Sequence, residues 1–196
     1  MRILILSGTG AIGKHLSQLL ADEHNELVIT SRQKREGSSR LQYIRGNAKE
    51  LGFVRPLLEK KWDVIIDFLI YSTVQFVERI DAFLNATKQY VYLSSARVYA
   101  ESRKNLVESS PRLLDTSQDD VYLATDEYAL LKAREEDLLH ASGSKNWTII
   151  RPYITYSEDR MQLGVLEKEE WLYRALKGRT IVFSEDIASK TTTVTY

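Results

Sequence analysis

Residues 2–13, with the sequence RILILSGTGAIG, constrain the fold of this chain more than any other segment. A short apolar run ends at a glycine-rich turn, and apolar residues then recur at helical spacing, at Ile12, Leu16, Leu19 and Leu20. The glycines Gly8, Gly10 and Gly13 form the pattern G-x-G-x-x-G, which permits a tight turn, a close approach of backbone to pyrophosphate and a close helix–strand contact. We therefore expect a strand, a phosphate-binding turn and a helix whose free N–H groups face the phosphate. A glycine turn without a ligand would show the same pattern.

Strand-like apolar runs and helical stretches alternate along the rest of the chain. We expect further strands at residues 27–29, 43–44, 63–70, 90–93 and 147–150, and extended segments at 180–183 and 191–196. The first helix is expected to end near Asn25, and others are expected around Pro56, at 74–87 with Val77, Ile80, Phe83 and Leu84 inside, at 126–140 and at 166–177. Strands that are apolar on both faces predict a doubly wound parallel α/β sheet with helices on both faces. The polar residues 96–126 show no clear periodicity.

Composition limits the partners that this chain is expected to have. With 196 residues, of which 43% are hydrophobic, it can form one domain with a sizeable core. Lysine and arginine together number 27, as do aspartate and glutamate, so no global field attracts nucleic acid or acidic membranes. We therefore expect neither nucleic acid nor a membrane as a partner.

The residue types that bind metals or form disulfides are scarce. There is no cysteine, which excludes disulfides and thiolate chemistry and fits a reducing compartment. The histidines His15, His24 and His140 do not have metal-ligand spacing, so no metal site is expected. We find no basic and apolar leader and no apolar run near the ~18 residues of a membrane span, which favours the cytoplasm.

Polar residues follow the predicted strands at five places. They lie in the glycine turn, at Ser31 and Arg32, at Asn47, at Ser94 and Ser95, and at Arg151 and Pro152. Because ligands bind beyond the carboxyl ends of parallel strands, near the point where strand order reverses, these residues are expected to meet at one edge. This convergence favours a cofactor site there.

Four motifs along the chain resemble those of the extended short-chain dehydrogenase/reductases, in the branch of NAD-dependent epimerases and dehydratases. They are GTGAIG at residues 8–13, SSARVY at 94–99, YALLK at 128–132 and RPYITY at 151–156, in the order of that family. The resemblance implies a Rossmann-like dinucleotide-binding domain over residues 1–178. Residues 179–196 would then begin a truncated or reduced C-terminal substrate region. A homodimer formed through the helices at 74–87 and 126–140 is also implied.

The resemblance assigns roles to three residues. Tyr128 would act as general acid/base, Lys132 would lower the pKa of Tyr128 and hold the cofactor ribose, and Ser95 would bind a substrate oxygen, with Ser94 as its rival. The implied substrate is a hydroxyl of a nucleotide sugar, and the implied reaction is oxidoreduction, epimerisation or dehydration. A tyrosine and a lysine four residues apart are neighbours on a helix, although an ordinary surface pair has the same spacing.

The resemblance also implies contacts with a nicotinamide dinucleotide. These are expected at Gly8, Gly10, Ala11, Ile12, Gly13, Ser31, Arg32, Asn47, Phe68, Leu69, Tyr128 and Lys132. An acidic residue after the second strand would favour NAD, whereas Ser31 and Arg32 suit a 2′-phosphate. We therefore expect NADP, with NAD as the alternative. Arg32 could also simply belong to a solvated basic loop that binds no cofactor. The side-chain carbonyl of Asn47 could accept a hydrogen bond from adenine.

One departure from the family pattern motivates a second functional class. The family has its first glycine where Ser7 stands here, and a serine restricts the backbone at the pyrophosphate turn. Weakened cofactor binding is therefore expected at this turn. The alternative function is a non-catalytic NAD(P)-binding regulator or scaffold that kept the fold.

Overall fold

The computed structural model of the protein describes residues 1–21, 24–157, 161–163, 166–185 and 194–195. The chain forms two compact units, Met1–Pro152 and Tyr153–Tyr196. The domain division predicted at residue 178 falls inside the second unit. The candidate site lies in the first unit.

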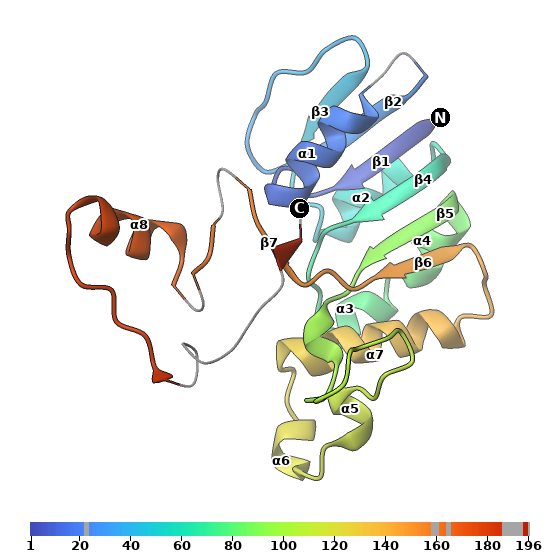
Figure 1. The fold of residues 1–196 in the computed structure, drawn as a ribbon. Helices are drawn as coiled ribbons and strands as arrows, with labels where there is room; N and C mark the ends of the chain where they lie inside the picture. The colour runs from blue at the N-terminus through green and yellow to red at the C-terminus, as the bar shows by residue number, and fades with distance from the viewer. Residues whose placement is uncertain (22–23, 158–160, 164–165, 186–193, 196) are drawn as a thin grey trace. The chain divides into compact units, whose positions relative to one another are not determined.

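The first unit is built on one parallel sheet of six strands (Figure 1). The strands are β1 (Arg2–Leu6), β2 (Glu26–Ser31), β3 (Leu41–Arg45), β4 (Trp62–Asp67), β5 (Thr87–Leu93) and β6 (Trp147–Ile150). Their order is β3-β2-β1-β4-β5-β6, and every neighbouring pair is parallel. The order reverses between β1 and β4, which places a topological switch point beside the glycine turn. The predicted doubly wound parallel sheet is confirmed.

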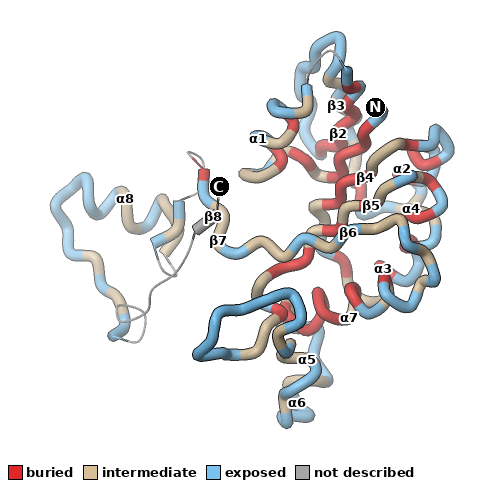
Figure 2. Tube along the Cα trace, turned by 45° about the vertical axis from the view of Figure 1, so that its right-hand side comes forward, coloured by how far each residue is buried: buried red, intermediate tan, exposed pale blue. Residues whose placement is uncertain are grey.

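Helices pack on both faces of this sheet. The helix α1 (Ala11–Leu20) places Leu16 and Leu20 against the apolar side chains of one face. The helices α2 (Leu51–Leu58), α4 (Ile80–Ala86) and α7 (Tyr128–Ala141) contribute Val54, Phe83 and Leu139 to the core on the other face. The red, buried stretches of Figure 2 follow mainly β1, β2 and β4 and parts of the helices, whereas the edge strands β3 and β6 are tan and pale blue.

Several predicted elements have different boundaries in the structure. The helix α1 ends at Leu20, before the predicted end near Asn25. The strand β4 ends at Asp67, so Phe68 and Leu69 lie in the loop beyond it rather than in the strand. The polar segment 96–126 contains only short helical pieces, the 3₁₀ turn η1 (Ala96–Val98), α5 (Leu113–Thr116) and α6 (Asp120–Leu123).

The helix predicted at residues 74–87 is broken. It forms α3 (Thr73–Val77) and α4, and Val77 is 53% exposed instead of lying on an inner face. The break lies at Arg79, which has a non-helical backbone (φ −128°) and is only 3% exposed. Its guanidinium lies over the ring of Tyr71, 4.5 Å from the centroid, and donates to the Lys49 carbonyl at 3.2 Å. Burial of this arginine therefore overrides the helical pattern.

The second unit contains α8 (Lys168–Leu176) and two short parallel strands, β7 (Ile154–Thr155) and β8 (Val194–Thr195). Gly178 follows α8 with a positive φ of 62°, the conformation of a helix C-cap. Residues 180–183, predicted as extended, form no strand among the described residues, and of the predicted segment 191–196 only β8 is described. Within the described ranges, no helix combines the length and the apolar character needed to cross a bilayer.

Candidate functional site

The glycine turn between β1 and α1 needs two of its glycines for packing. A Cβ on Gly13 would lie 2.6 Å from the backbone of Gly8, and a Cβ on Gly8 would lie 2.5 Å from the Ile5 side chain. A Cβ on Gly10 would meet no atom within 4 Å. Gly10 is exposed at the N-cap of α1, so its surface is open to a ligand at the helix N-terminus.

Ser7 adopts the conformation that the family glycine would have. Its φ is +59°, in the left-handed region that a side chain disfavours. Its backbone N–H donates to the Thr30 hydroxyl on β2 at 2.9 Å, which holds the turn against the neighbouring strand. The serine therefore leaves the turn formed, with local backbone strain at its first residue.

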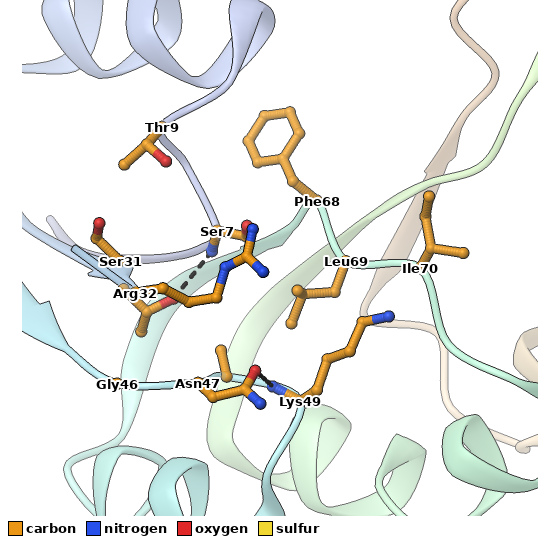
Figure 3. Close-up of a pocket in the computed structure, with 12 residues that line it drawn as sticks. Ser7, Thr9, Ser31, Arg32, Gly46, Asn47, Lys49, Phe68, Leu69 and Ile70 are labelled. Carbon is orange, nitrogen blue, oxygen red and sulfur yellow. Dashed lines mark hydrogen bonds between the residues drawn. The ribbon is translucent and has the colours of Figure 1, made fainter.

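A cleft of about 300 Å³ opens beyond the carboxyl ends of β1 to β4 (Figure 3). It is lined by Ser7, Thr9, Thr30, Ser31, Arg32, Gly46, Asn47, Ala48, Lys49, Phe68, Leu69 and Ile70. Five predicted cofactor contacts are in this set, namely Ser31, Arg32, Asn47, Phe68 and Leu69. The other predicted cofactor contacts do not line it, namely Gly8, Gly10, Ala11, Ile12, Gly13, Tyr128 and Lys132. Of the five polar sets predicted to meet at this edge, the glycine turn, Ser31 with Arg32, and Asn47 contribute to the cleft, whereas Ser94, Ser95, Arg151 and Pro152 do not line it.

Two cationic side chains reach this cleft from different elements. Arg32 follows β2, and Lys49 lies in the loop after β3 (Figure 3). Both are exposed. Lys49 was missed in the sequence because it stands just beyond Asn47, and only the tertiary fold brings it opposite Arg32. Two cations and no carboxylate line the cleft, which favours an anionic ligand.

The side chain of Asn47 already has partners within its own turn. Its Oδ1 accepts from the Lys49 backbone N–H at 3.2 Å, and its Nδ2 donates to Glu50 at 3.0 Å. An amide oxygen has two lone pairs, so Oδ1 keeps one for a ligand. Asn47 therefore shapes the loop that lines the cleft as well as facing the cleft.

Lys132 is buried in a charged cluster between α7 and the sheet. It is 1% exposed, and its Nζ donates to Tyr92 at 2.9 Å, to Glu135 at 3.3 Å and to the Leu69 carbonyl at 3.4 Å. The Tyr92 hydroxyl also donates to Glu135. The helix spacing that places Lys132 four residues after Tyr128 thus also places it one turn from a buried carboxylate.

Burial governs the charges of this cluster. Desolvation raises the pKa of Glu135 to about 7, and the neighbouring Lys132 opposes that rise. Desolvation also lowers the pKa of Lys132, against the attraction of Glu135 and Asp67. Among the described residues, no group forms a hydrogen bond with the Oε1 oxygen of Glu135. Sequence reasoning missed Glu135, because a glutamate in a charged helix is ordinarily exposed.

A second buried carboxylate, Asp67, positions the cleft residue Leu69. Asp67, at the end of β4, is fully buried and accepts hydrogen bonds at 2.9 Å from the hydroxyls of Tyr71 and Tyr90. Burial raises the pKa of Asp67, and its hydrogen bonds oppose that rise. Asp67 also accepts from the backbone N–H of Leu69 at 2.9 Å, while Lys132 binds the Leu69 carbonyl. Leu69 is therefore held at both backbone groups by buried charges.

The structure places the predicted serines in different environments. The Ser94 hydroxyl donates to Glu136 at 2.5 Å, so it is engaged with a buried carboxylate. The Ser95 hydroxyl accepts from the Arg97 backbone N–H at 3.2 Å and caps η1. The Arg97 guanidinium in turn lies 5.3 Å from the centroid of the Tyr128 ring. Ser95 and Tyr128 are thus linked through Arg97.

Arg151 has a structural ion pair. Its guanidinium donates to both oxygens of Glu136, at 2.8 and 2.7 Å, and to the Tyr99 hydroxyl at 2.8 Å. Glu136 is completely buried, and these bonds neutralise it. Within the described ranges, no group of three or more histidine, aspartate or glutamate side chains is placed to hold a metal ion.

The fold and the cleft together define a Rossmann-like sheet with a ligand cleft at its switch point. The model of the NAD dependent epimerase/dehydratase family matches residues 3–186. The chain therefore belongs to this family, as its motifs predicted. It is also 31% identical over 199 residues to chloroplast stem-loop binding protein of 41 kDa b from Arabidopsis thaliana, a match that covers 92% of this chain and 48% of the relative.

Solved structures share the fold at low sequence identity. WbmH from Bordetella bronchiseptica in complex with NAD+ has a TM-score of 0.70 at 17% identity, covering 91% of this chain and 63% of that one. UDP-glucuronic acid 4-epimerase from Bacillus cereus, in complex with UDP-glucuronic acid and NAD, has a TM-score of 0.66 at 17% identity, covering 91% and 64%. The chain spans about half of the curated relative and less than two thirds of these structures.

Proposed function

We propose that this chain binds a nicotinamide dinucleotide in the cleft beyond β1 to β4, with NADP preferred over NAD. The observation that carries the proposal is the cleft itself, which lies at the switch point beside a glycine turn open at Gly10. Two similar structures are of proteins in complex with NAD+ or NAD. No carboxylate lines the cleft at the end of β2, where one would favour NAD.

The chemistry of these residues suits such a cofactor. Gly10 and the N-terminus of α1 would hold the pyrophosphate, because backbone N–H groups are free there. Ser31 and Arg32 would bind a 2′-phosphate through a hydroxyl and a guanidinium. Asn47 would accept a hydrogen bond from adenine, and Leu69, held at both backbone groups, would form a fixed wall.

We further propose that the whole protein acts on a hydroxyl of a nucleotide-sugar-like substrate, as an oxidoreductase, epimerase or dehydratase. The bound nicotinamide would supply hydride transfer. Tyr128 would accept or return the hydroxyl proton, Ser95 would hold the substrate oxygen, and Lys132 would provide the positive charge that stabilises the Tyr128 phenolate. The structure of UDP-glucuronic acid 4-epimerase with its nucleotide sugar supports this substrate class.

Calorimetric titration with NADP and NAD tests the cofactor proposal. The Arg32→Gln variant is expected to bind NADP at least about tenfold more weakly and NAD nearly unchanged, because one charge-assisted contact to a 2′-phosphate is lost. Lys34→Gln, which removes a neighbouring exposed cation outside the cleft, is the matched control. Tighter binding of NAD by the unaltered protein would refute the NADP preference.

The Tyr128→Phe variant tests the catalytic proposal. It keeps the ring that lies beside Arg97 and removes only the hydroxyl, so dinucleotide binding is expected to stay and turnover to fall by about 100-fold or more. Turnover is measured with UDP-sugars on the longest form of the protein that the gene encodes. Unchanged turnover would show that Tyr128 is not the acid/base.

The second candidate is a dinucleotide-binding protein without turnover, and the position of Lys132 favours it. Its Nζ contacts Glu135, Tyr92 and a backbone carbonyl, so its charge is shared with groups other than a ribose or a phenolate. The similar chloroplast protein is named for binding a stem-loop, which supports a binding role. Bound NADP without turnover of any UDP-sugar would favour this candidate. Turnover that Tyr128→Phe abolishes would exclude it.

A further inference from the structure

A second cleft, of about 280 Å³, lies on the α1 face of the sheet. Its lining includes Lys14 and Gln18 on α1, Arg35 in the loop after β2, and Tyr43 on β3. Only Thr9 also lines the first cleft, so the two clefts lie on either side of the glycine turn. Among the residues that the structure describes, the lining of the second cleft has two cations, Lys14 and Arg35, an aromatic ring and no carboxylate. This chemistry suits a phosphate and a base.

The cations extend beyond this cleft. Residues 32–49 contain six lysines and arginines, namely Arg32, Lys34, Arg35, Arg40, Arg45 and Lys49, against one carboxylate, Glu36. All six are exposed, and Figure 2 shows the loop between β2 and β3 in the colour of exposed residues. None of the six side chains forms a hydrogen bond or an ion pair within the part of the chain that the structure describes. The neutral balance of the whole chain therefore hides a strongly positive segment.

The sheet arranges these charges along its outer edge. The strand β3 is the edge strand, and residues 32–40 cross to it from β2 without a helix. Side chains alternate along a strand, so Arg45 lies on the same face as Leu41 and Tyr43, which line the cleft. Arg40 precedes the strand at its other end. At about 3.3 Å per residue, the five steps from Arg40 to Arg45 span roughly 16 Å, about the length of five stacked nucleotides.

The number of charges exceeds what the proposed cofactor needs. A 2′-phosphate carries at most two negative charges, which Arg32 and Lys49 in the first cleft could neutralise. Lys34, Arg35, Arg40 and Arg45 remain outside that cleft. A row of exposed cations beside an aromatic residue is the arrangement by which single strands are bound, with phosphates on the cations and bases stacked on rings.

We propose that the outer side of β3 and the second cleft form a binding site for single-stranded nucleic acid, with phosphates on Arg35, Arg40 and Arg45 and one base against Tyr43. We expect an unpaired base in this cleft of about 280 Å³, because a base paired and stacked inside a duplex does not present its face to a side chain. The total charge of the chain argued against nucleic acid, but the charge that a ligand meets is the local one. The site goes beyond the proposed dinucleotide function and shares no charged residue with its cleft.

The test uses fluorescence anisotropy with a labelled oligouridylate of about 12 nucleotides, within the ~4–16 nucleotide range of single-strand sites. The triple variant Arg35→Gln/Arg40→Gln/Arg45→Gln removes three proposed phosphate contacts. At about 0.7 per contact, the slope of log K against log salt is expected to flatten by about 2, and affinity at low salt to fall about 10- to 100-fold. The matched control, Arg103→Gln/Lys104→Gln/Lys145→Gln, removes three exposed cations elsewhere in the first unit and is expected to change little.

The aromatic contact is tested separately. Tyr43→Leu is expected to weaken oligouridylate binding about tenfold or more with an unchanged salt slope, and Tyr43→Phe to restore it, because a ring is needed for stacking and a hydroxyl is not. Each variant is checked for an unchanged thermal unfolding midpoint. NADP affinity is measured in parallel, since an intact dinucleotide cleft with lost oligouridylate binding separates this site from the first one.

Four results would overturn the proposal. Equal losses in the two triple variants would mean that only net charge attracts the strand. A duplex of the same length bound as tightly as the single strand would remove the role of Tyr43, as would a Tyr43→Leu variant that binds normally. Binding to vesicles containing phosphatidylserine, without binding to oligouridylate, would assign the cations to a lipid surface. If NADP fails to bind while the oligouridylate binds as expected, the cofactor proposal fails and this site stands.

Discussion

Replacing Glu135 by glutamine should change how the stability of this protein depends on pH. Glu135 is fully buried beside Lys132, and burial raises its pKa from 4.5 to about 7. A carboxyl with a raised pKa binds its proton more tightly in the folded state than in the unfolded state. Its contribution to stability is therefore fully present below about pH 4.5 and is lost as the pH rises through about 7.

The size of this effect follows from the same pKa. At about 1.4 kcal/mol per pKa unit, a rise from 4.5 to about 7 corresponds to about 3 kcal/mol of unfolding free energy. Glutamine cannot ionise, so the variant lacks this dependence. The unfolding free energy of the unaltered protein minus that of Glu135→Gln should therefore fall by up to about 3 kcal/mol between about pH 5 and pH 7.5.

Urea unfolding at a series of pH values measures this difference. The exposed Glu36→Gln variant serves as the control, and its difference from the unaltered protein is expected to stay flat. Titration of Asp67 and Lys132 affects both proteins of the pair, so taking the difference removes much of it. A difference that is constant with pH, or that rises with pH, would refute the argument that desolvation controls Glu135.

Three further substitutions test the packing of the site. Gly13→Ala is expected to lower the free energy of unfolding in urea by more than about 2 kcal/mol, because its Cβ would lie 2.6 Å from the backbone of Gly8. Gly52→Ala in α2, whose Cβ would meet no atom within 4 Å, should raise that free energy by up to about 1 kcal/mol. Similar values for the two variants would contradict this. Ser7→Gly should stabilise the protein by about 1 kcal/mol by relieving the φ of +59°, and a loss of stability would show that the serine side chain is needed. Arg151→Gln should cost about 1.5–3 kcal/mol, because the buried Glu136 loses its bidentate partner but keeps the Ser94 hydroxyl and the Arg112 guanidinium at 3.4 Å, and a cost under about 1 kcal/mol would contradict that role.

Much of the fold could be predicted from the sequence, because the deciding signals are local. Apolar runs and helical spacing marked all six strands of the sheet and the long helix α7, and strands apolar on both faces required helices on each side. Strand ends predicted Ser31, Arg32 and Asn47 at the edge where the cleft is found, and the family resemblance added Phe68 and Leu69, which also line it. The motifs also placed the chain in its family.

The tertiary structure decided what depends on contacts between distant segments. Arg79 broke a helix whose local pattern was continuous, because its guanidinium is buried against Tyr71 and the Lys49 carbonyl. Ser7 kept the turn of a glycine because Thr30, on another strand, accepts its N–H.

Burial decided the state of Lys132 as well. The spacing of Tyr128 and Lys132 is a property of one helix, and the sequence by itself determined it. Whether that lysine faces a ligand or a buried carboxylate depends on which side of the helix the sheet covers. Charge and pKa follow from the surrounding atoms, and a linear pattern carries only the residues that are neighbours along the chain.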